Sequence, residues 1–334
     1  MSRVARIFLL MVLASAVFVS CGSPAASTLS TPISATVIPA TAIPATAVPA
    51  TAMPTAVLAA AAPTAGTAKQ DAGVLNTTID VGGRSLYILC TGAGSPTVIL
   101  DNGLDADLTI WSSAMLPLQR VTRVCAYDRA GVGKSDPAPK PRTSKDMVQD
   151  LHTLLTNAKV PGPYVLVGWS IAGFNVRVYA SQYPADVVGM VLVEASHPDQ
   201  FERRLAALPP PTSSDSDDLK GWREYLSKFP SDLSWNDEGM DIATSATQVR
   251  ATGSLGAMPL VVLSRGLSDE LPGLPKEVAA KQEQIWSELQ KELAGLSTNS
   301  SQMIADVSHH CIPCDQPDMV AKAIKKVVRA VQSK

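Results

Sequence analysis

Basic charge, long apolar runs and cysteine are all scarce in this chain of 334 residues. The formal net charge is −2, and it becomes −4 without Arg3 and Arg6, so the sequence has no basic surplus of the kind that nucleic-acid binding needs. The apolar run from Ile7 to Val19 is too short to span a bilayer. Four of the 5 cysteines lie beyond position 21, and in an exported chain they are free to form disulfides.

The first twenty residues have the order of a secretory signal peptide, because Arg3 and Arg6 precede the apolar run. The run ends in residues 18–22, Phe-Val-Ser-Cys-Gly, which resemble a bacterial lipobox, where a small residue precedes a cysteine that is lipidated after cleavage. We therefore predict a signal peptide over residues 1–20 and a lipid anchor at Cys21. The predicted location is extracytoplasmic and membrane-anchored, at the cell surface or in the periplasm. Ordinary secretion with an incidental cysteine is the alternative.

Residues 21–70 contain no aromatic side chain and one charge, Lys69. A pentad of Ile or Val followed by Pro-Ala-Thr-Ala occurs three times in succession between Ile38 and Ala52. Proline at every fifth position blocks helix formation and favours an extended chain. This composition cannot bury a core, so we interpret residues 21–70 as a semi-rigid spacer that begins at the lipobox cysteine.

From about residue 75 to residue 334, short apolar runs alternate with amphipathic segments. A hairpin is predicted around Gly82-Gly83, between strands at 77–81 and 84–91. Further strands are predicted at 97–101, 123–127, 164–167, 187–193, 259–264 and 302–307, and helices at about 110–118, 143–155, 171–183, 276–293 and from Pro317 onward. This alternation predicts one α/β domain with a mostly parallel central sheet flanked by helices.

The strand pattern lapses between about residues 197 and 256. This stretch contains a triple proline, an acidic tract and the aromatic residues Trp222, Tyr225, Phe229 and Trp235. Short helices fit it better than strands, so we predict a small helical lid inserted into the domain. Most of its aromatic side chains are expected to pack the lid down, with the lining of an apolar pocket as the alternative role.

The segment 164–173 carries the chemistry. An apolar run from 164 to 167 stops at Gly168, Ser170 follows at the tip of a tight turn, and an amphipathic helix comes next. Strand, turn with serine, and helix form the layout of a nucleophile elbow. A helix N-terminus behind the serine offers free N–H groups to an oxyanion. The usual pattern is G-x-S-x-G and the fifth position here is Ala172, so a serine in an ordinary turn is the alternative.

A serine hydroxyl needs a base to remove its proton, and four histidines are available. His152 lies on a predicted surface helix and is interpreted as structural. His197 follows the strand 187–193 and is expected near the mouth of a pocket. His309 and His310 follow the last predicted strand, directly before a helix, and are the candidate bases.

Four segments together resemble the α/β-hydrolase family over residues 75–334: Gly-Trp-Ser at 168–170, Tyr-Asp-Arg-Ala-Gly-Val-Gly-Lys-Ser at 127–135, Val-Leu-Val-Glu at 191–194 and Ser-His-His-Cys-Ile at 308–312. The chain order of serine, acid and then histidine after the final strand agrees with this family. Family members commonly read Ser-Gly-His-x-Ile before the last helix, which places His310, in preference to His309, on the catalytic histidine. A serine at the elbow argues against relatives that use aspartate there, the epoxide hydrolases and haloalkane dehalogenases.

The resemblance also implies the other site residues. The backbone N–H groups of Leu104 and Ile171 would form the oxyanion hole. The acid that orients the histidine is expected to be Asp269, which follows the strand 259–264 at the G-x-x-D spacing from Gly266. Glu194, at the end of the preceding strand, is the alternative acid, because some family members place theirs at this position.

Two further motifs have competing interpretations. Residues 131–135, Gly-Val-Gly-Lys-Ser, resemble the end of a phosphate-binding loop, but that motif needs glycine where this chain has Asp128, whose charge would repel a phosphate. Cys311 and Cys314 form a C-x-x-C pair that fits a structural disulfide or free thiols better than a redox pair or a zinc site with His309. The family fold makes Cys90 and Cys125 neighbours on adjacent strands, which implies a second bridge.

We therefore predict a membrane-tethered serine hydrolase that cleaves an ester or related acyl bond through an acyl-enzyme at Ser170, without metal or organic cofactor. Its expected partners are a small-molecule ester or acyl substrate and the membrane, and not nucleic acid. A non-catalytic, ligand-binding surface lipoprotein on a hydrolase fold is the rival from another class. A C–C bond hydrolase or a cofactor-free haloperoxidase is the rival within the fold.

Overall fold

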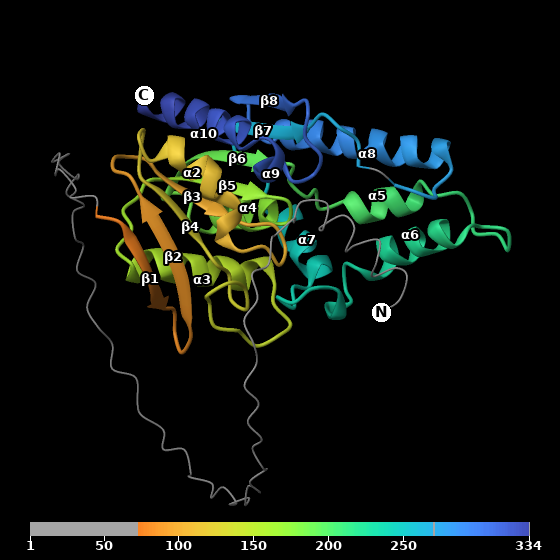
Figure 1. Cartoon of the computed structure of the whole chain (residues 1–334), viewed down its shortest axis with the longest axis horizontal. Coiled ribbons are helices and arrows are strands. Elements are labelled where there is room, and N and C mark those ends of the chain that lie inside the picture. The colour runs from red at the N-terminus through yellow and green to blue at the C-terminus, as the bar shows by residue number, and fades with distance from the viewer. Residues whose placement is uncertain (1–72, 270, 334) are drawn as a thin grey trace, which may run out of the picture. The chain divides into compact units, whose positions relative to one another are not determined.

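The computed structural model describes residues 73–269 and 271–333. The predicted signal peptide, Cys21 and the spacer lie outside these residues. Eight strands form one sheet in the order β1-β2-β4-β3-β5-β6-β7-β8. β1 pairs with β2 and β2 with β4 in antiparallel fashion, and all other pairs are parallel. The predicted mostly parallel sheet is therefore confirmed (Figure 1).

The elements follow the predicted alternation closely. The strands are β1 Leu75–Asp80, β2 Ser85–Thr91, β3 Thr97–Asp101, β4 Val124–Tyr127, β5 Tyr164–Trp169, β6 Val187–Val193, β7 Leu260–Arg265 and β8 Ser300–Ala305. The helices outside the insertion described below are η1 Leu108–Trp111, α2 Ser112–Leu118, α3 Ser144–Asn157, α4 Ala172–Gln182, α8 Lys276–Ala294, α9 Ile312–Asp315 and α10 Pro317–Gln332. Both Gly82 and Gly83 have positive φ, as the tight turn between β1 and β2 requires.

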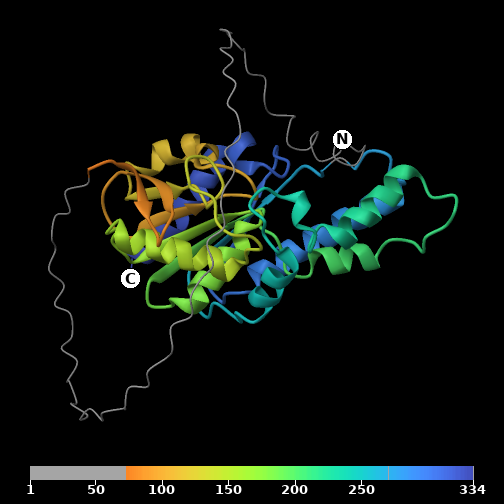
Figure 2. The same cartoon turned by 90° about the horizontal axis from the view of Figure 1, so that it is seen from below.

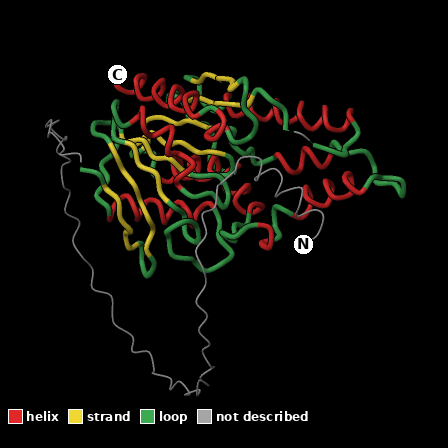
Figure 3. Tube along the Cα trace, in the orientation of Figure 1, coloured by secondary structure: helices red, strands yellow, loops and turns green. Residues whose placement is uncertain are grey.

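The core lies where the helices cover the sheet, and Figure 3 shows helices on either side of the central strands. Alternate residues of β5, β6 and β7 face the C-terminal helix α10, so that Val167, Val193 and Leu263 share one buried cluster with Ile324. Figure 1 shows α2 and α10 together on one side of the sheet and α3 on the other. Gly189 of β6 lets α10 pack close to the sheet, since a Cβ at this position would lie 2.4 Å from the Val327 side chain.

The stretch 197–256 forms a helical insertion, as predicted. Its elements are α5 Gln200–Ala206, α6 Asp217–Lys228, η2 Leu233–Trp235 and α7 Ile242–Arg250. The rings of Tyr225 and Phe229 lie 4.8 Å apart, and those of Trp222 and Tyr225 lie 5.2 Å apart. These aromatic side chains therefore pack mainly against one another, as expected. Figure 2 shows the green and teal insertion helices beside the blue α8.

Candidate active site

The turn after β5 holds Ser170 in a conformation that few side chains adopt. Its φ is 55°, in the left-handed region, where a non-glycine residue is strained. The strain is held by two backbone hydrogen bonds, from the N–H of Ser170 to the carbonyl of Val193 and from the N–H of Ser196 to the carbonyl of Ser170. The predicted elbow is present, and it leaves Ser170 half-buried between β5 and α4.

Small residues make this turn sterically feasible. A Cβ at Gly168 would lie 2.7 Å from the carbonyl oxygen of Ala172, and one at Gly173 would lie 2.6 Å from the Cβ of Ala195. Ala172, in place of the usual glycine, is fully buried and fits without disrupting the elbow. The close packing of helix on strand depends on the glycines that flank this alanine.

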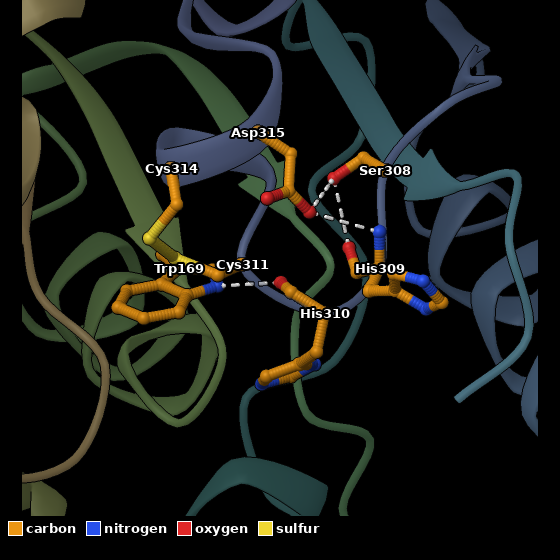
Figure 4. Close-up of a disulfide and its surroundings, with 7 residues drawn as sticks. All are labelled: Trp169, Ser308, His309, His310, Cys311, Cys314 and Asp315. Atoms are coloured by element: carbon orange, nitrogen blue, oxygen red, sulfur yellow. Dashed lines mark hydrogen bonds between the residues drawn. A yellow bond between two sulfur atoms is a disulfide. The ribbon is translucent and has the colours of Figure 1, made fainter. Parts of the chain in front are cut away.

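His310 reaches Ser170 from the other side of the site. Its Nε2 lies 2.9 Å from the Oγ of Ser170, and its side chain is 40% exposed. Trp169 Nε1 donates a hydrogen bond to the His310 carbonyl at 3.0 Å. The disulfide between Cys311 and Cys314 closes the turn that follows (Figure 4). The backbone of His310 is thus fixed on both sides.

The ring of His309 points away from the ring of His310, as Figure 4 shows. Its ring Nδ1 lies 3.0 Å from the carbonyl oxygen of Ser268, and its N–H donates to Asp315 at 3.0 Å. Of the two adjacent histidines, the structure therefore brings His310 to the serine, as the family spacing implied.

Glu194, at the carboxyl end of β6, is the carboxylate beside His310. Its Oε1 lies 3.9 Å from the His310 Nδ1, which is longer than a hydrogen bond and becomes an ion pair when His310 is protonated. Oε1 also accepts hydrogen bonds from the Arg265 side chain and the Trp286 indole, and Oε2 accepts one from the Arg265 N–H. Burial would raise the pKa of Glu194, but the contacts with His310 and Arg265 outweigh burial and hold this pKa below its ordinary value of 4.5. Glu194 is therefore ionised, and its φ of 44° marks it as a second strained residue at a strand end.

Among the described residues Asp269 forms an ion pair with Arg265 and none with His310, so the expectation that Asp269 lies within hydrogen-bonding reach of His310 is corrected. Its carboxylate lies 3.4 Å from the Arg265 guanidinium and is 29% exposed. The physical reason is the buried Arg265 side chain, which also pairs with Glu283 at 2.6 Å. Arg265 needs counter-charges, and Asp269 is one of the carboxylates that it draws in.

The two predicted oxyanion donors have free N–H groups. Within residues 73–269 and 271–333, no hydrogen bond is formed by the N–H of Ile171 or of Leu104. Ile171 directly precedes α4, and Leu104 lies in the loop after β3. The Trp169 ring packs on that loop so tightly that a Cβ at Gly103 would lie 2.8 Å from it. One donor without an acceptor among the described residues therefore follows Ser170 directly, and the other lies in a loop that the neighbouring Trp169 ring contacts.

The other two histidines, His152 and His197, contact aromatic or acidic side chains of their own. His152 stacks on Tyr183 with ring centroids 3.8 Å apart, which agrees with a structural role. His197 is buried and lies 3.5 Å from Glu292. Burial lowers the pKa of His197 despite this neighbouring acid and Asp199.

The phosphate-loop interpretation fails for a direct reason. Asp128 fills the turn itself, with its carboxylate accepting from the N–H of Leu108 and of Lys134. The Lys134 amide, which a phosphate would need, is thus already occupied by a carboxylate of the same chain.

Both candidate disulfides are present, including the pair for which free thiols were the alternative. Cys90 and Cys125 are direct partners on β2 and β4, and Cys311 and Cys314 are bonded to each other. The bonded cysteines have no thiolate to offer a metal. Within the part of the chain that the structure describes, no group of three or more His, Cys, Asp or Glu side chains could hold a metal ion.

Arg265 and Trp286 contact Glu194 and were not singled out as site residues from the sequence. Arg265 ends β7, one strand from Glu194, so an arginine at a strand end beside a candidate acid was the available signal. Trp286 lies on α8, 92 residues from Glu194 in the sequence, and no local pattern indicates that the two side chains meet.

A family comparison agrees with this geometry. The family described as alpha/beta hydrolase fold matches residues 96–307, which includes the elbow and both candidate acids. The chain belongs to the α/β-hydrolase family. Solved structures with this fold include an esterase and a haloalkane dehalogenase.

Relatives and solved structures cover most of the domain. An uncharacterised protein, YqjL of Bacillus subtilis, is 29% identical over 71% of this chain and 85% of its own length. A thermophilic esterase from Thermogutta terrifontis has a TM-score of 0.53 at 20% identity, over 78% of this chain and 99% of its own. A haloalkane dehalogenase variant from Bradyrhizobium elkanii has a TM-score of 0.54 at 13% identity, over 78% and 98%. At such identities the two structures establish the shared fold.

Proposed function

We propose that this α/β hydrolase is a serine hydrolase that cleaves a carboxylic ester or a related acyl compound through an acyl-enzyme at Ser170. The observation that carries the proposal is the 2.9 Å contact between Ser170 Oγ, at the tip of a strained turn, and His310 Nε2. A strained residue within reach of a base is typical of a catalytic nucleophile.

In the first half of the reaction, the Ser170 Oγ attacks the acyl carbon and its proton passes to His310 Nε2. The carbonyl oxygen becomes an oxyanion, and the free N–H groups of Ile171 and Leu104 donate to it. The imidazolium then gives its proton to the leaving alcohol oxygen as the bond to the acyl carbon breaks. An ester of Ser170 and a free alcohol result.

In the second half, His310 takes a proton from a water molecule, whose oxygen attacks the acyl-enzyme. The same two N–H groups hold the second oxyanion. The proton returns from His310 to Ser170 Oγ as the serine ester breaks, and the carboxylic acid leaves. No electron transfer occurs, so the chemistry is complete with the residues of this chain and water.

Glu194 is the acid in this proposal, in place of Asp269. A buried, ionised carboxylate 3.9 Å from the Nδ1 side stabilises the imidazolium that forms when His310 accepts the serine proton. Arg265 and Trp286 fix the position of that carboxylate through hydrogen bonds. Glu194 therefore acts through the charge on His310 and does not take up the proton itself.

The proposed setting is extracytoplasmic, with the protein tethered to the membrane by lipid at Cys21. The sequence of the leader and the lipobox supports this placement. No helix among the described residues is long and apolar enough to cross a membrane.

The test is labelling with a fluorophosphonate probe, followed by turnover of p-nitrophenyl esters of increasing acyl length. Wild type should be labelled and Ser170→Ala should not, with the two proteins unfolding at the same temperature. Labelling that persists in Ser170→Ala would place the nucleophile elsewhere. A folded wild-type protein that reacts with no probe and no ester would instead support the ligand-binding alternative.

A further inference from the structure

The described residues contain a fully buried arginine that the proposed mechanism does not use. Arg129 follows β4 in the Asp-Arg-Ala-Gly-Val-Gly segment and is 2% exposed. Burying a guanidinium is costly unless every donor is satisfied. All five of its N–H groups have an acceptor, and the identity of those acceptors indicates what the residue does.

Two of the acceptors are carbonyls of the loop that offers the second oxyanion donor. Arg129 Nη1 donates to the carbonyl of Asn102 and Nη2 to the carbonyl of Gly103, each at 2.6 Å. Nη1 also donates to Asp101 at the end of β3, again at 2.6 Å. We name residues 102–105 the β3 loop.

Peptide geometry turns this contact into a constraint on Leu104. In a planar trans peptide the C=O and the N–H point in opposite directions. The carbonyl of Gly103 and the N–H of Leu104 belong to the same peptide. Because Arg129 holds that carbonyl on the buried side, the Leu104 N–H is directed the opposite way, and it is the N–H that has no acceptor within the described residues.

The other two donors of Arg129 bind the helical insertion. Nε and Nη2 donate two parallel hydrogen bonds to the carboxylate of Glu238, each with a donor–acceptor distance of 2.6 Å. Glu238 is 1% exposed. Glu238 lies within the insertion, between η2 and α7. Its Oε1 also accepts from the N–H of Asp105 at 2.7 Å, so one carboxylate holds both the arginine and the end of the β3 loop.

The contact is reciprocal. The Asp105 side chain accepts from the N–H of Asp237 at 2.9 Å and from that of Glu238 at 3.1 Å. Asp105 has a φ of 56°, so the loop adopts a strained turn in order to make these bonds. The insertion and the β3 loop are thus joined by side chains from both partners.

We infer that Arg129 and Glu238 are positioning residues for the second oxyanion donor. Through these two side chains, the position of the insertion on the sheet fixes the direction of the Leu104 N–H. The inference rests on the proposed function, because it assigns a role to a donor of the oxyanion hole. Arg129 and Glu238 touch neither serine nor histidine, so they act on the transition state through the β3 loop.

The main test variant is Glu238→Gln, compared with a matched control, Asp150→Asn. Asp150 is also a buried acid that binds two arginines, Arg84 and Arg142, and none of its contacts is to the β3 loop. Removing an oxyanion donor costs about 10²- to 10³-fold in rate. Misdirecting one should cost less, so we expect the kcat of Glu238→Gln for p-nitrophenyl acetate to fall roughly 10- to 100-fold, with KM changing less than about 3-fold.

A transition-state analogue separates positioning from general destabilisation. A trifluoromethyl ketone forms a tetrahedral adduct with the serine and places an oxyanion in the hole, so its affinity for Glu238→Gln should fall by the same factor as kcat. The pH profile of kcat should keep its shape, because the His310 and Glu194 pair is untouched. Asp150→Asn should keep both values within about 3-fold even if its melting temperature falls equally. Arg129→Lys, which keeps the charge but loses the fork, should reproduce the Glu238→Gln result.

Hydrogen exchange of the β3 loop provides a readout that does not need catalysis. The Asp105 amide should exchange faster in Glu238→Gln than in wild type, and its exchange rate should be unchanged in Asp150→Asn. Both rates are measured by mass spectrometry on folded protein. Unchanged kcat and exchange in folded Glu238→Gln, or equal losses in both variants, would overturn the inference. Faster exchange in a protein whose wild type reacts with no ester would refute the proposed function and leave the link between loop and insertion standing.

Discussion

Replacing Glu194 by glutamine is the sharpest perturbation of the proposed mechanism, because it removes a charge and keeps the shape. The Oε1 of Glu194 lies 3.9 Å from His310 Nδ1. At an effective dielectric constant of about 20, opposite charges at that distance attract by about 4 kcal/mol, which is roughly 10³-fold in rate. Arg265 shares the same carboxylate and weakens its field at the imidazole. We therefore expect Glu194→Gln to lower kcat by about 10²- to 10³-fold.

The matched control is Asp269→Asn. Asp269 forms a partly exposed ion pair with Arg265, and such pairs contribute about 1 kcal/mol or less. Its kcat should stay within about 5-fold of wild type. Glu194→Asp keeps the charge and should recover part of the activity lost in Glu194→Gln.

The assay is initial-rate hydrolysis of p-nitrophenyl acetate together with the rate of fluorophosphonate labelling, on proteins shown by melting temperature to be folded. Loss of several orders of magnitude in Asp269→Asn with little change in Glu194→Gln would refute the reasoning and make Asp269 the acid. Equal small effects in both would mean that neither carboxylate supports His310.

The lowered pKa of Glu194 also predicts that the stability difference between wild type and Glu194→Gln depends on pH. Because contacts with His310 and Arg265 hold the pKa of Glu194 below 4.5 in the folded state, the ionised carboxylate stabilises the protein above that pH. This stabilisation is lost as the pH falls through the lowered folded-state pKa. The melting temperature of wild type should therefore exceed that of Glu194→Gln at pH 7, and the difference should shrink as the pH falls below 4.5.

Three further predictions concern the elbow, the sheet and the anchor. Gly168→Ala should lower both the melting temperature and kcat, the latter at least roughly 10-fold, because its Cβ would meet the backbone oxygen of Ala172 at 2.7 Å; Ala172→Gly, which restores the common pattern, should remain active, and an active, fully stable Gly168→Ala would contradict the steric argument. Replacing Cys90 and Cys125 by serine should lower the free energy of unfolding in urea by about 4 kcal/mol, since the bridge closes a loop with a sequence separation of 35; no change on replacement would show that the bridge does not constrain the unfolded chain. Cys21→Ala should move the protein from the membrane fraction to the soluble fraction after cell lysis, and its retention with membranes would place the anchor elsewhere.

The local sequence determined the elements and the reactive pair. Apolar runs and helical periodicity act over a few residues, so they predicted the sheet, the helices around it and the capping box at Thr143, which the structure forms with Asp146. The elbow is also local, because the backbone turn at Ser170 depends on the small residues beside it. His310 was preferred to His309 because residues 308–312 resemble the family pattern Ser-Gly-His-x-Ile.

Tertiary structure decided which carboxylate meets the histidine. Glu194 and Asp269 follow adjacent parallel strands, whose carboxyl ends lie at the same edge of the sheet, so sequence order alone could not separate them. The choice depends on side-chain direction and on Arg265, which stands between the two acids and binds both. Likewise, Arg129 and Glu238 are 109 residues apart, and their pairing requires the insertion to be seated on the sheet. A buried charged side chain must have a specific partner, whereas an exposed one need not. Which charges are buried, and beside which partners, is decided only when the chain folds.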